Sequence, residues 1–270
     1  MHRRAICVLI AGGLLLASTS QAGAEPLKPL KPWVLDYAET QCIASRDFGS
    51  VVFGIEPAPS GGTFDLLLFE PHPGPYYPAE VKGTVDFGDG PISAWGLVSA
   101  IKSNRTTLYQ VRIPAIDFKQ AVSASTVRIA AKSAQLDRSF ALSDMSQLLT
   151  GLDRCIADLQ RHWNMTPEGQ ARIATRAKGT VKSLFIPEDF PYDVWSGGQY
   201  GGGKFLLLVG EDGRVKGCHV LEATGSPAID SVACGIYIRR ARFSPARDRN
   251  GKPMRDTMVT PPIEWGYDRN

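Results

Sequence analysis

The chain has 270 residues, of which 43% are hydrophobic and 21% charged, the composition of a globular protein with about two domains. It excludes a disordered chain and a collagen-like repeat. The formal charge at pH 7 is +3, and loss of Arg3 and Arg4 with an N-terminal leader would leave 28 basic against 27 acidic side chains, a net charge of +1. A net positive charge this small gives no reason to expect nucleic acid as a partner.

Residues 1–24 are predicted to be a cleaved signal peptide. Arg3 and Arg4 give it a basic start, residues 5–17 are apolar, and residues 22–24 form a small-residue Ala-Gly-Ala cleavage site. The apolar run of 13 residues is shorter than the ~20 that span a bilayer. Cys7 precedes most of that run, which disfavours a lipoprotein anchor. We therefore expect a protein exported to the periplasm, with no membrane anchor after cleavage.

Four cysteines remain after the signal peptide, and they are predicted to form two disulfides. An even number of cysteines in an oxidising compartment favours crosslinks, and four allow three pairings. Two lie before residue 164 and two lie in the last quarter, so we pair Cys42 with Cys155 and Cys218 with Cys234. Zinc is the competing use, but there is no C-x-x-C pair and histidines are few. We expect no metal and no cofactor.

Residues 25–163 are predicted to form an N-terminal α+β domain, mostly an antiparallel sheet with one long helix. Its expected strands, separated by clusters of Gly, Pro, Ser and Asp, are residues 51–56, 64–69, 81–87, 108–113 and 127–131. From residue 143 to Trp163 apolar side chains recur mostly every three or four positions, as in an amphipathic helix, and Ser143 is a candidate cap. Residues 33–46 are consistent with either strand or helix.

Residues 164–186 read as a polar, basic linker in which Thr166 and Pro167 predict the start of a short helix. A second small domain is predicted over residues 187–270, with the order strand, strand, helix, strand. Two strands, residues 205–209 and 215–221, are joined by a tight turn. A helix capped by Ser226 follows over residues 226–237, and the final extended run covers residues 254–265.

The second domain resembles the C-terminal domain of TonB-like proteins over residues 187–265. The motifs that carry the resemblance are Glu211-Asp212-Gly213-Arg214-Val215, Cys218 and Val220, Gly225-Ser226, Asp230 and Cys234, Arg240-Ala241-Arg242-Phe243-Ser244-Pro245-Ala246, Gly251-Lys252-Pro253 and, upstream, Phe190-Pro191-Tyr192. The resemblance implies a periplasmic β-β-α-β domain. In the energy transducers of that family, it grips a short extended segment of an outer-membrane transporter by strand addition.

The sequence departs from the family in two ways. Energy transducers keep an uncleaved membrane helix and a long Pro-rich spacer, which are not expected here, so we do not expect this chain to transduce energy by itself. The last strand contains Pro261 and Pro262, which have no N–H for a ladder. The predicted partner-binding edge is therefore limited to Met254, Arg255, Asp256, Thr257, Met258, Val259 and Thr260.

Two motifs of catalytic type have simpler explanations. Residues 198–204 match the Gly, Gly and Lys spacing of a phosphate loop, but Phe205 replaces the Ser or Thr that would hold magnesium, and a strand follows where a helix should begin. Ser226, His219 and Asp230 can be drawn as a triad, but no nucleophile elbow surrounds Ser226, whose position predicts a helix cap.

Charged side chains give two further candidate sites. Asp86, Asp89 and Asp117 lie near turns or the ends of elements, where Asp commonly forms hydrogen bonds with the backbone. A carboxylate pair for glycan hydrolysis is the less favoured alternative, which only geometry can decide. Arg239, Arg240 and Arg242 begin a basic strip for acidic glycan or lipid, although a solvated helix end is the favoured interpretation.

Together these features predict a non-enzymatic protein-interaction protein of the periplasm, auxiliary to TonB-dependent outer-membrane transport. Its expected partner is a protein or peptide, with an outer-membrane transporter as the leading candidate. One alternative is an envelope-structure protein that binds cell wall. Another is an enzyme or inhibitor site in the N-terminal domain, with the C-terminal module as a targeting or dimerising appendage. A homodimer formed by strand exchange also stays open.

Overall fold

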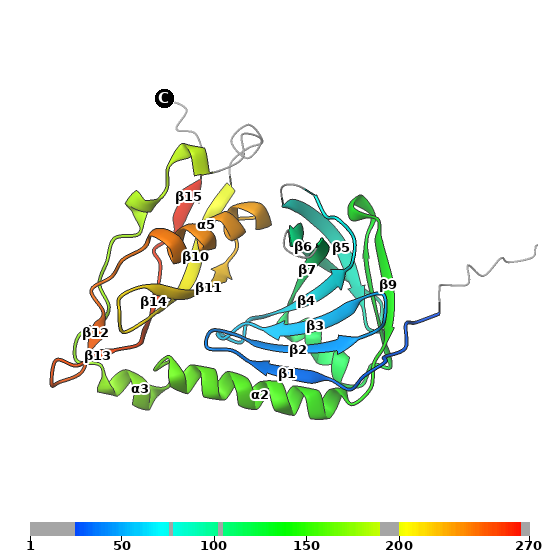
Figure 1. Ribbon diagram of the computed structural model, residues 1–270, viewed down its shortest axis with the longest axis horizontal. Coiled ribbons are helices and arrows are strands. Elements are labelled where there is room, and N and C mark those ends of the chain that lie inside the picture. The colour runs from blue at the N-terminus through cyan, green and yellow to red at the C-terminus, as the bar shows by residue number, and fades with distance from the viewer. Residues whose placement is uncertain (1–24, 76–77, 102–104, 190–199, 266–270) are drawn as a thin grey trace, which may run out of the picture.

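The computed structural model describes residues 25–75, 78–101, 105–189 and 200–265 (Figure 1). It combines a large curled antiparallel sheet, a smaller sheet and several helices, of which one is long. The predicted α+β class is confirmed at this level.

The large sheet has nine strands in the order β1-β2-β3-β4-β7-β6-β5-β8-β9, all paired antiparallel. They are β1 (Val34–Tyr37), β2 (Cys42–Asp47), β3 (Val52–Pro57), β4 (Thr63–Glu70), β5 (Ala79–Asp86), β6 (Pro91–Ile101), β7 (Thr106–Pro114), β8 (Thr126–Ala131) and β9 (Leu136–Ala141). All five predicted strands are confirmed. The undecided residues 33–46 form β1 and β2, while β6 and β9 were not predicted.

Strand alternation gives the large sheet two different faces. Leu66 and Leu68 on β4 and Ile113 on β7 are completely buried in the core inside the curl. Because successive side chains of a strand point to opposite faces, their neighbours Asp65 and Arg112 lie on the outer face. The outer face of the central strands is therefore polar in part, and it is the face turned toward the C-terminal unit.

The long helix α2 (Met145–His162) covers the core of the large sheet with Leu148, Leu152 and Leu159, as the apolar stripe predicts. The prediction that Ser143 caps it was wrong, because Asp144 occupies the capping position in a left-handed conformation without a side-chain cap bond. The Ser143 hydroxyl instead accepts a hydrogen bond of 2.8 Å from Arg46. Two short helical turns, α1 (Ala115–Phe118) and η1 (Lys119–Val122), follow β7, and η2 (Lys132–Ala134) joins β8 to β9.

The C-terminal unit is a small sheet with one helix. Its order is β11-β10-β14, and β15 also pairs with β10. The elements are β10 (Tyr200–Val209), β11 (Val215–Glu222), α5 (Pro227–Arg240), β14 (Asp256–Val259) and β15 (Ile263–Trp265), with a separate hairpin of β12 (Ala246–Arg247) and β13 (Pro253–Met254). Phe205, Leu207 and Val209 pack against Ile229 and Ile236 of α5 in a second core.

The predicted linker is packed along the C-terminal unit. Thr166 caps α3 (Pro167–Arg172) by accepting a bond from the Gly169 N–H, as predicted. Further along, Lys178 forms a β-bridge with Ser244, and Val181 is buried in the second core. Two short turns, η3 (Lys182–Leu184) and η4 (Pro187–Asp189), complete the segment. Residues 174–185 thus pack on the C-terminal unit, whereas Met165 at the start of the predicted linker packs against the core of the large sheet.

Candidate functional site

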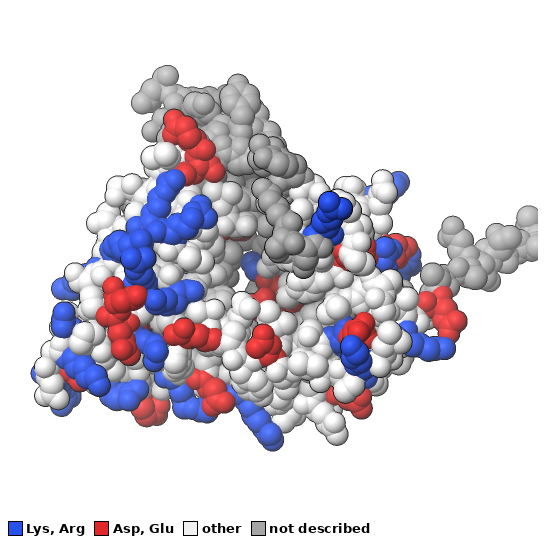
Figure 2. Space-filling model, viewed as in Figure 1, with Lys and Arg blue, Asp and Glu red and all other residues white. Residues whose placement is uncertain are grey.

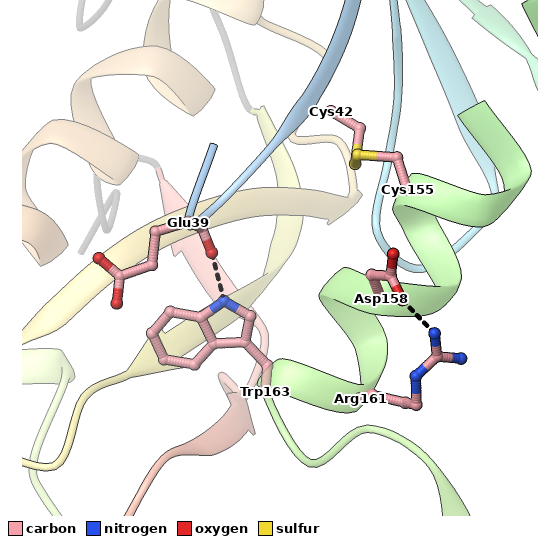
Figure 3. The surroundings of a disulfide bond; sticks show 6 residues. All are labelled: Glu39, Cys42, Cys155, Asp158, Arg161 and Trp163. Atoms are coloured by element: carbon pink, nitrogen blue, oxygen red, sulfur yellow. Dashed lines mark hydrogen bonds and ion pairs between the residues drawn. A yellow bond between two sulfur atoms is a disulfide. The ribbon is translucent and has the colours of Figure 1, made fainter. Parts of the chain in front are cut away.

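Both predicted disulfides are present, and each joins a strand to a helix. Cys42 on β2 is bonded to Cys155 on α2, with 6.0 Å between their Cα atoms (Figure 3). Cys218 on β11 is bonded to Cys234 on α5, with 5.4 Å between the Cα atoms. Two disulfides fit an oxidising compartment. Within the described ranges, no helix is long and apolar enough to cross a bilayer.

Trp163 at the end of α2 joins the two units. Its side chain is completely buried, and its indole N–H donates a hydrogen bond of 2.7 Å to the Glu39 carbonyl in the turn between β1 and β2 (Figure 3). Arg255 of the C-terminal unit lies over the Trp163 ring, 5.9 Å from its centroid, and pairs with Glu39 at 3.6 Å. Arg255 is thus used between the units, and it is turned away from the predicted partner-binding edge.

The predicted edge is divided between two elements. Met254 belongs to β13 and pairs with Ala246, whereas residues 256–259 form β14 at the outside of the small sheet. The Thr260 N–H donates to the Phe205 carbonyl at 2.9 Å. Counting back from Thr260, every second residue of β14 therefore directs its backbone groups toward β10. By the alternation of antiparallel ladders, Met258 and Asp256 also face β10, whereas the backbone groups of Thr257 and Val259 face outward.

One of these two outward positions is already occupied. The Thr257 carbonyl accepts a bond of 2.9 Å from Arg176, and its N–H donates to the Asp256 carboxylate at 2.8 Å. Asp256 is completely buried and also pairs with Arg176 at 2.9 Å. At Val259, by contrast, no described residue bonds to the outward N–H or carbonyl, and the residue is 53% exposed. The open edge of β14 is therefore centred on Val259.

The predicted basic strip is partly used inside the fold. Arg240 forms two hydrogen bonds of 2.6 Å with Asp189, and Arg242 donates to the Ala241 carbonyl at 2.7 Å. Arg239 is exposed at the end of α5. Figure 2 shows Lys and Arg side chains gathered over the C-terminal unit, with Asp and Glu side chains between them. Such mixed charge is typical of a solvated surface.

The imagined Ser226 triad, the turn aspartate Asp86 and the glycine loop of residues 198–204 have structural roles where the structure describes them. The Ser226 hydroxyl accepts from the Ile229 N–H as the cap of α5, as predicted, and donates to the Glu80 carboxylate of β5 rather than to His219. Asp86 accepts hydrogen bonds from two backbone N–H groups of its turn, at 2.7 and 3.2 Å. Lys204 forms an ion pair of 2.7 Å with Glu222, while residues 198–199 of the glycine loop and residues 190–192 lie outside the described residues.

A row of polar side chains that the sequence did not reveal crosses the outer face of the large sheet. Glu56, Asp65, Arg112 and Trp95 stand directly opposite one another on β3, β4, β7 and β6. Arg112 and Asp65 form a two-point ion pair with both distances at 2.6 Å, and Gln110 adds a bond of 2.8 Å to Asp65. The Arg112 guanidinium lies 5.4 Å from the centre of the Trp95 ring.

This row forms one wall of a cavity of about 320 Å³ between the two units. The opposite wall comes from β11 and from one face of α5, and it includes His219, Val220, Pro227, Asp230 and Ile238. Positions 227, 230, 234 and 238 recur every three or four residues, so they share one helix face. The other face, with Ile229 and Ile236, is buried in the second core.

Burial perturbs the titration of three groups in this cavity. Desolvation, followed by the nearby charge of Asp65, raises the pKa of Glu56 to about 7. Desolvation lowers the pKa of His219 to about 4, so its imidazole is neutral at pH 7. Desolvation also raises the pKa of the Asp230 carboxyl. Perturbed pKa values of this kind gather at functional sites.

Comparisons of the chain with protein-family models, curated proteins and solved structures find no match.

Proposed function

We propose that the chain is a non-catalytic binding protein of the bacterial periplasm, whose C-terminal unit captures an extended peptide by strand addition at β14. The leading partner is a segment of an outer-membrane transporter, with the chain acting as an auxiliary of TonB-dependent transport. The observation that carries the proposal is the outward backbone of Val259, which bonds to no described residue at the edge of the small sheet. An unpaired edge is the template that strand addition uses.

The order of elements supports the resemblance to TonB-like C-terminal domains. The main elements of the unit come in the order β10, β11, α5 and β14, which is the order that the resemblance implies, and the short hairpin of β12 and β13 lies between α5 and β14. The disulfide between Cys218 and Cys234 fixes α5 to β11 on the side away from β14. The binding edge is therefore separate from the crosslink.

A partner strand would pair first at Val259, because Arg176 already occupies the carbonyl of Thr257. Arg176 is 47% exposed, but its guanidinium also pairs with the completely buried Asp256 carboxylate, so its departure from that carbonyl costs part of this ion pair. Pairing with both residues would then need displacement of the Arg176 guanidinium from the Thr257 carbonyl and release of the Thr257 N–H from the Asp256 carboxylate. The expected affinity is modest, since only a few backbone hydrogen bonds are gained and each contributes about 0.5–1.5 kcal/mol.

The test is calorimetric titration of the signal-free protein with a synthetic peptide carrying the extended transporter segment. Val259→Pro removes the outward N–H, which donates no bond within the described fold, and is expected to weaken binding at least tenfold with little change in thermal stability. Val259→Ala is the matched control, because it shortens the same side chain but keeps the N–H. Unchanged affinity of a folded Val259→Pro protein would refute strand addition at β14.

A further inference from the structure

The cavity between the units exposes hydrogen-bond acceptors that the fold leaves unused. Asp230 is 3% exposed; one carboxylate oxygen accepts from the Thr224 N–H at 3.1 Å, and the other has no partner among the described residues. The Nε2 atom of His219 is likewise buried without a described partner. The Glu56 carboxyl group, which lines the cavity, forms no hydrogen bond or ion pair with any residue that the structure describes. Unpaired buried polar atoms are costly, so they point to a ligand.

The charge of the cavity wall is acidic. Arg112 is the one Lys or Arg among the described lining residues, and Asp65 neutralises it through two bonds of 2.6 Å. This pairing leaves the carboxyl groups of Glu56 and Asp230 without an ion pair of their own among the described residues. A ligand that balances this wall must therefore carry positive charge and hydrogen-bond donors.

The rest of the lining is apolar and limits the size of the ligand. Trp95 and Leu97 lie on the sheet side, and Val220, Pro227 and Ile238 lie on the opposite side. A volume of about 320 Å³ is at the lower end of the range of about 300–1,000 Å³ for small-molecule sites. The ligand is therefore compact, with one apolar portion.

We propose that this cavity binds a compact organic cation, a primary amine with an apolar body, whose ammonium group donates hydrogen bonds to Asp230 and Glu56. The Trp95 ring and the aliphatic side chains around it would hold the apolar body. This site lies on the β11 side of the small sheet and is independent of peptide capture at β14.

Binding of such a cation should depend on pH through Glu56. The charged and titratable groups around Glu56 are Asp65, Arg112, His219 and Asp230, from β4, β7, β11 and α5. Glu56, with a pKa of about 7, must be ionised to pair with the ammonium group. Since the apparent affinity scales with the competent fraction, it should rise about tenfold from pH 6 to pH 8.

The experiment is calorimetric titration of the signal-free protein with phenethylamine, and with 2-phenylethanol and phenylacetate as neutral and anionic analogues. Phenethylamine should bind at least tenfold more tightly than either analogue at pH 8. Asp230→Asn should weaken its binding at least tenfold, and Glu56→Gln should weaken it and remove the pH dependence. Asp153→Asn, on the exposed face of α2, is the matched control and should bind as wild type.

Three results would overturn the proposal. They are no binding of phenethylamine at millimolar concentration, equal or tighter binding of either analogue, and wild-type affinity in a folded Asp230→Asn protein. Both carboxyl variants are nearly isosteric and remove a charge that burial disfavours, so they should fold. Circular dichroism establishes this before titration.

Discussion

Replacement of Glu56 by Gln is expected to stabilise the protein at pH 8 and to leave its stability nearly unchanged at pH 4. The folded state raises the pKa of Glu56 from 4.5 to about 7, mainly through desolvation. A carboxyl group with a raised pKa binds its proton more tightly in the folded state than in the unfolded state. The loss of folding stability caused by ionised Glu56 is therefore absent below pH 4.5, grows as the pH rises, and is complete above pH 7.

The size of the effect follows from the pKa shift. A rise from 4.5 to about 7 is about 2.5 units, and each unit corresponds to about 1.36 kcal/mol, so ionised Glu56 costs about 3 kcal/mol at pH 8. The Gln side chain has nearly the same shape and carries no charge at any pH. The gain of Glu56→Gln over wild type should thus grow from near zero at pH 4 to about 3 kcal/mol at pH 8.

Urea unfolding with intact disulfides, followed by circular dichroism at both pH values, measures this difference. Other groups titrate in both proteins and cancel in the comparison. Asp153→Asn, at an exposed position of α2, should show no such pH-dependent gain. An equal gain at pH 4 and pH 8, or a loss at pH 8, would refute the argument, since Glu56 would then be stabilised as an anion beside Arg112.

Three further predictions concern single contacts. Replacement of Cys42 and Cys155 by Ala opens a loop of 113 residues and should lower the free energy of unfolding by about 4–5 kcal/mol, measured by urea unfolding. Ser226→Ala removes the cap of α5 and should cost about 1–2 kcal/mol, whereas Ser226→Asn should recover part of it; a stability loss below 0.3 kcal/mol would contradict the cap. Arg176→Ala frees the Thr257 carbonyl but also removes the ion pair of the buried Asp256, so it should lower the free energy of unfolding, while the folded protein should capture peptide about 2–10-fold more tightly in calorimetry; unchanged affinity would confine pairing to Val259.

Local sequence signals predicted much of the large sheet and the long helix. The apolar stripe of residues 145–163 predicted α2 because one face of that helix covers the core. Strand β6 (Pro91–Ile101) was missed because it begins with Pro and contains Gly96, both weak strand signals. At Gly96 the reason is tertiary, since a Cβ atom there would lie 1.8 Å from the Gln110 carbonyl oxygen of β7.

The polar row of the cavity could not be predicted from the sequence. Asp65 is a charged residue among the apolar residues of β4. Such a residue indicates that one face of the strand lies outside the core, but it does not indicate which part of the protein packs against that face. Glu56, Asp65 and Arg112 come together only through the register of β3, β4 and β7. Asp230 lies in the first turn of α5, and only the packing of the units places it opposite that row.

Amide hydrogen exchange at Val259, with and without the transporter peptide, tests strand addition most directly. The account predicts that the Val259 N–H exchanges rapidly in the free protein and becomes protected in the complex. Met258, whose N–H faces β10, should be protected in both states and serves as the internal reference. Protection of Val259 in the free protein, or no change when the peptide binds, would contradict the claim that β14 is an open edge.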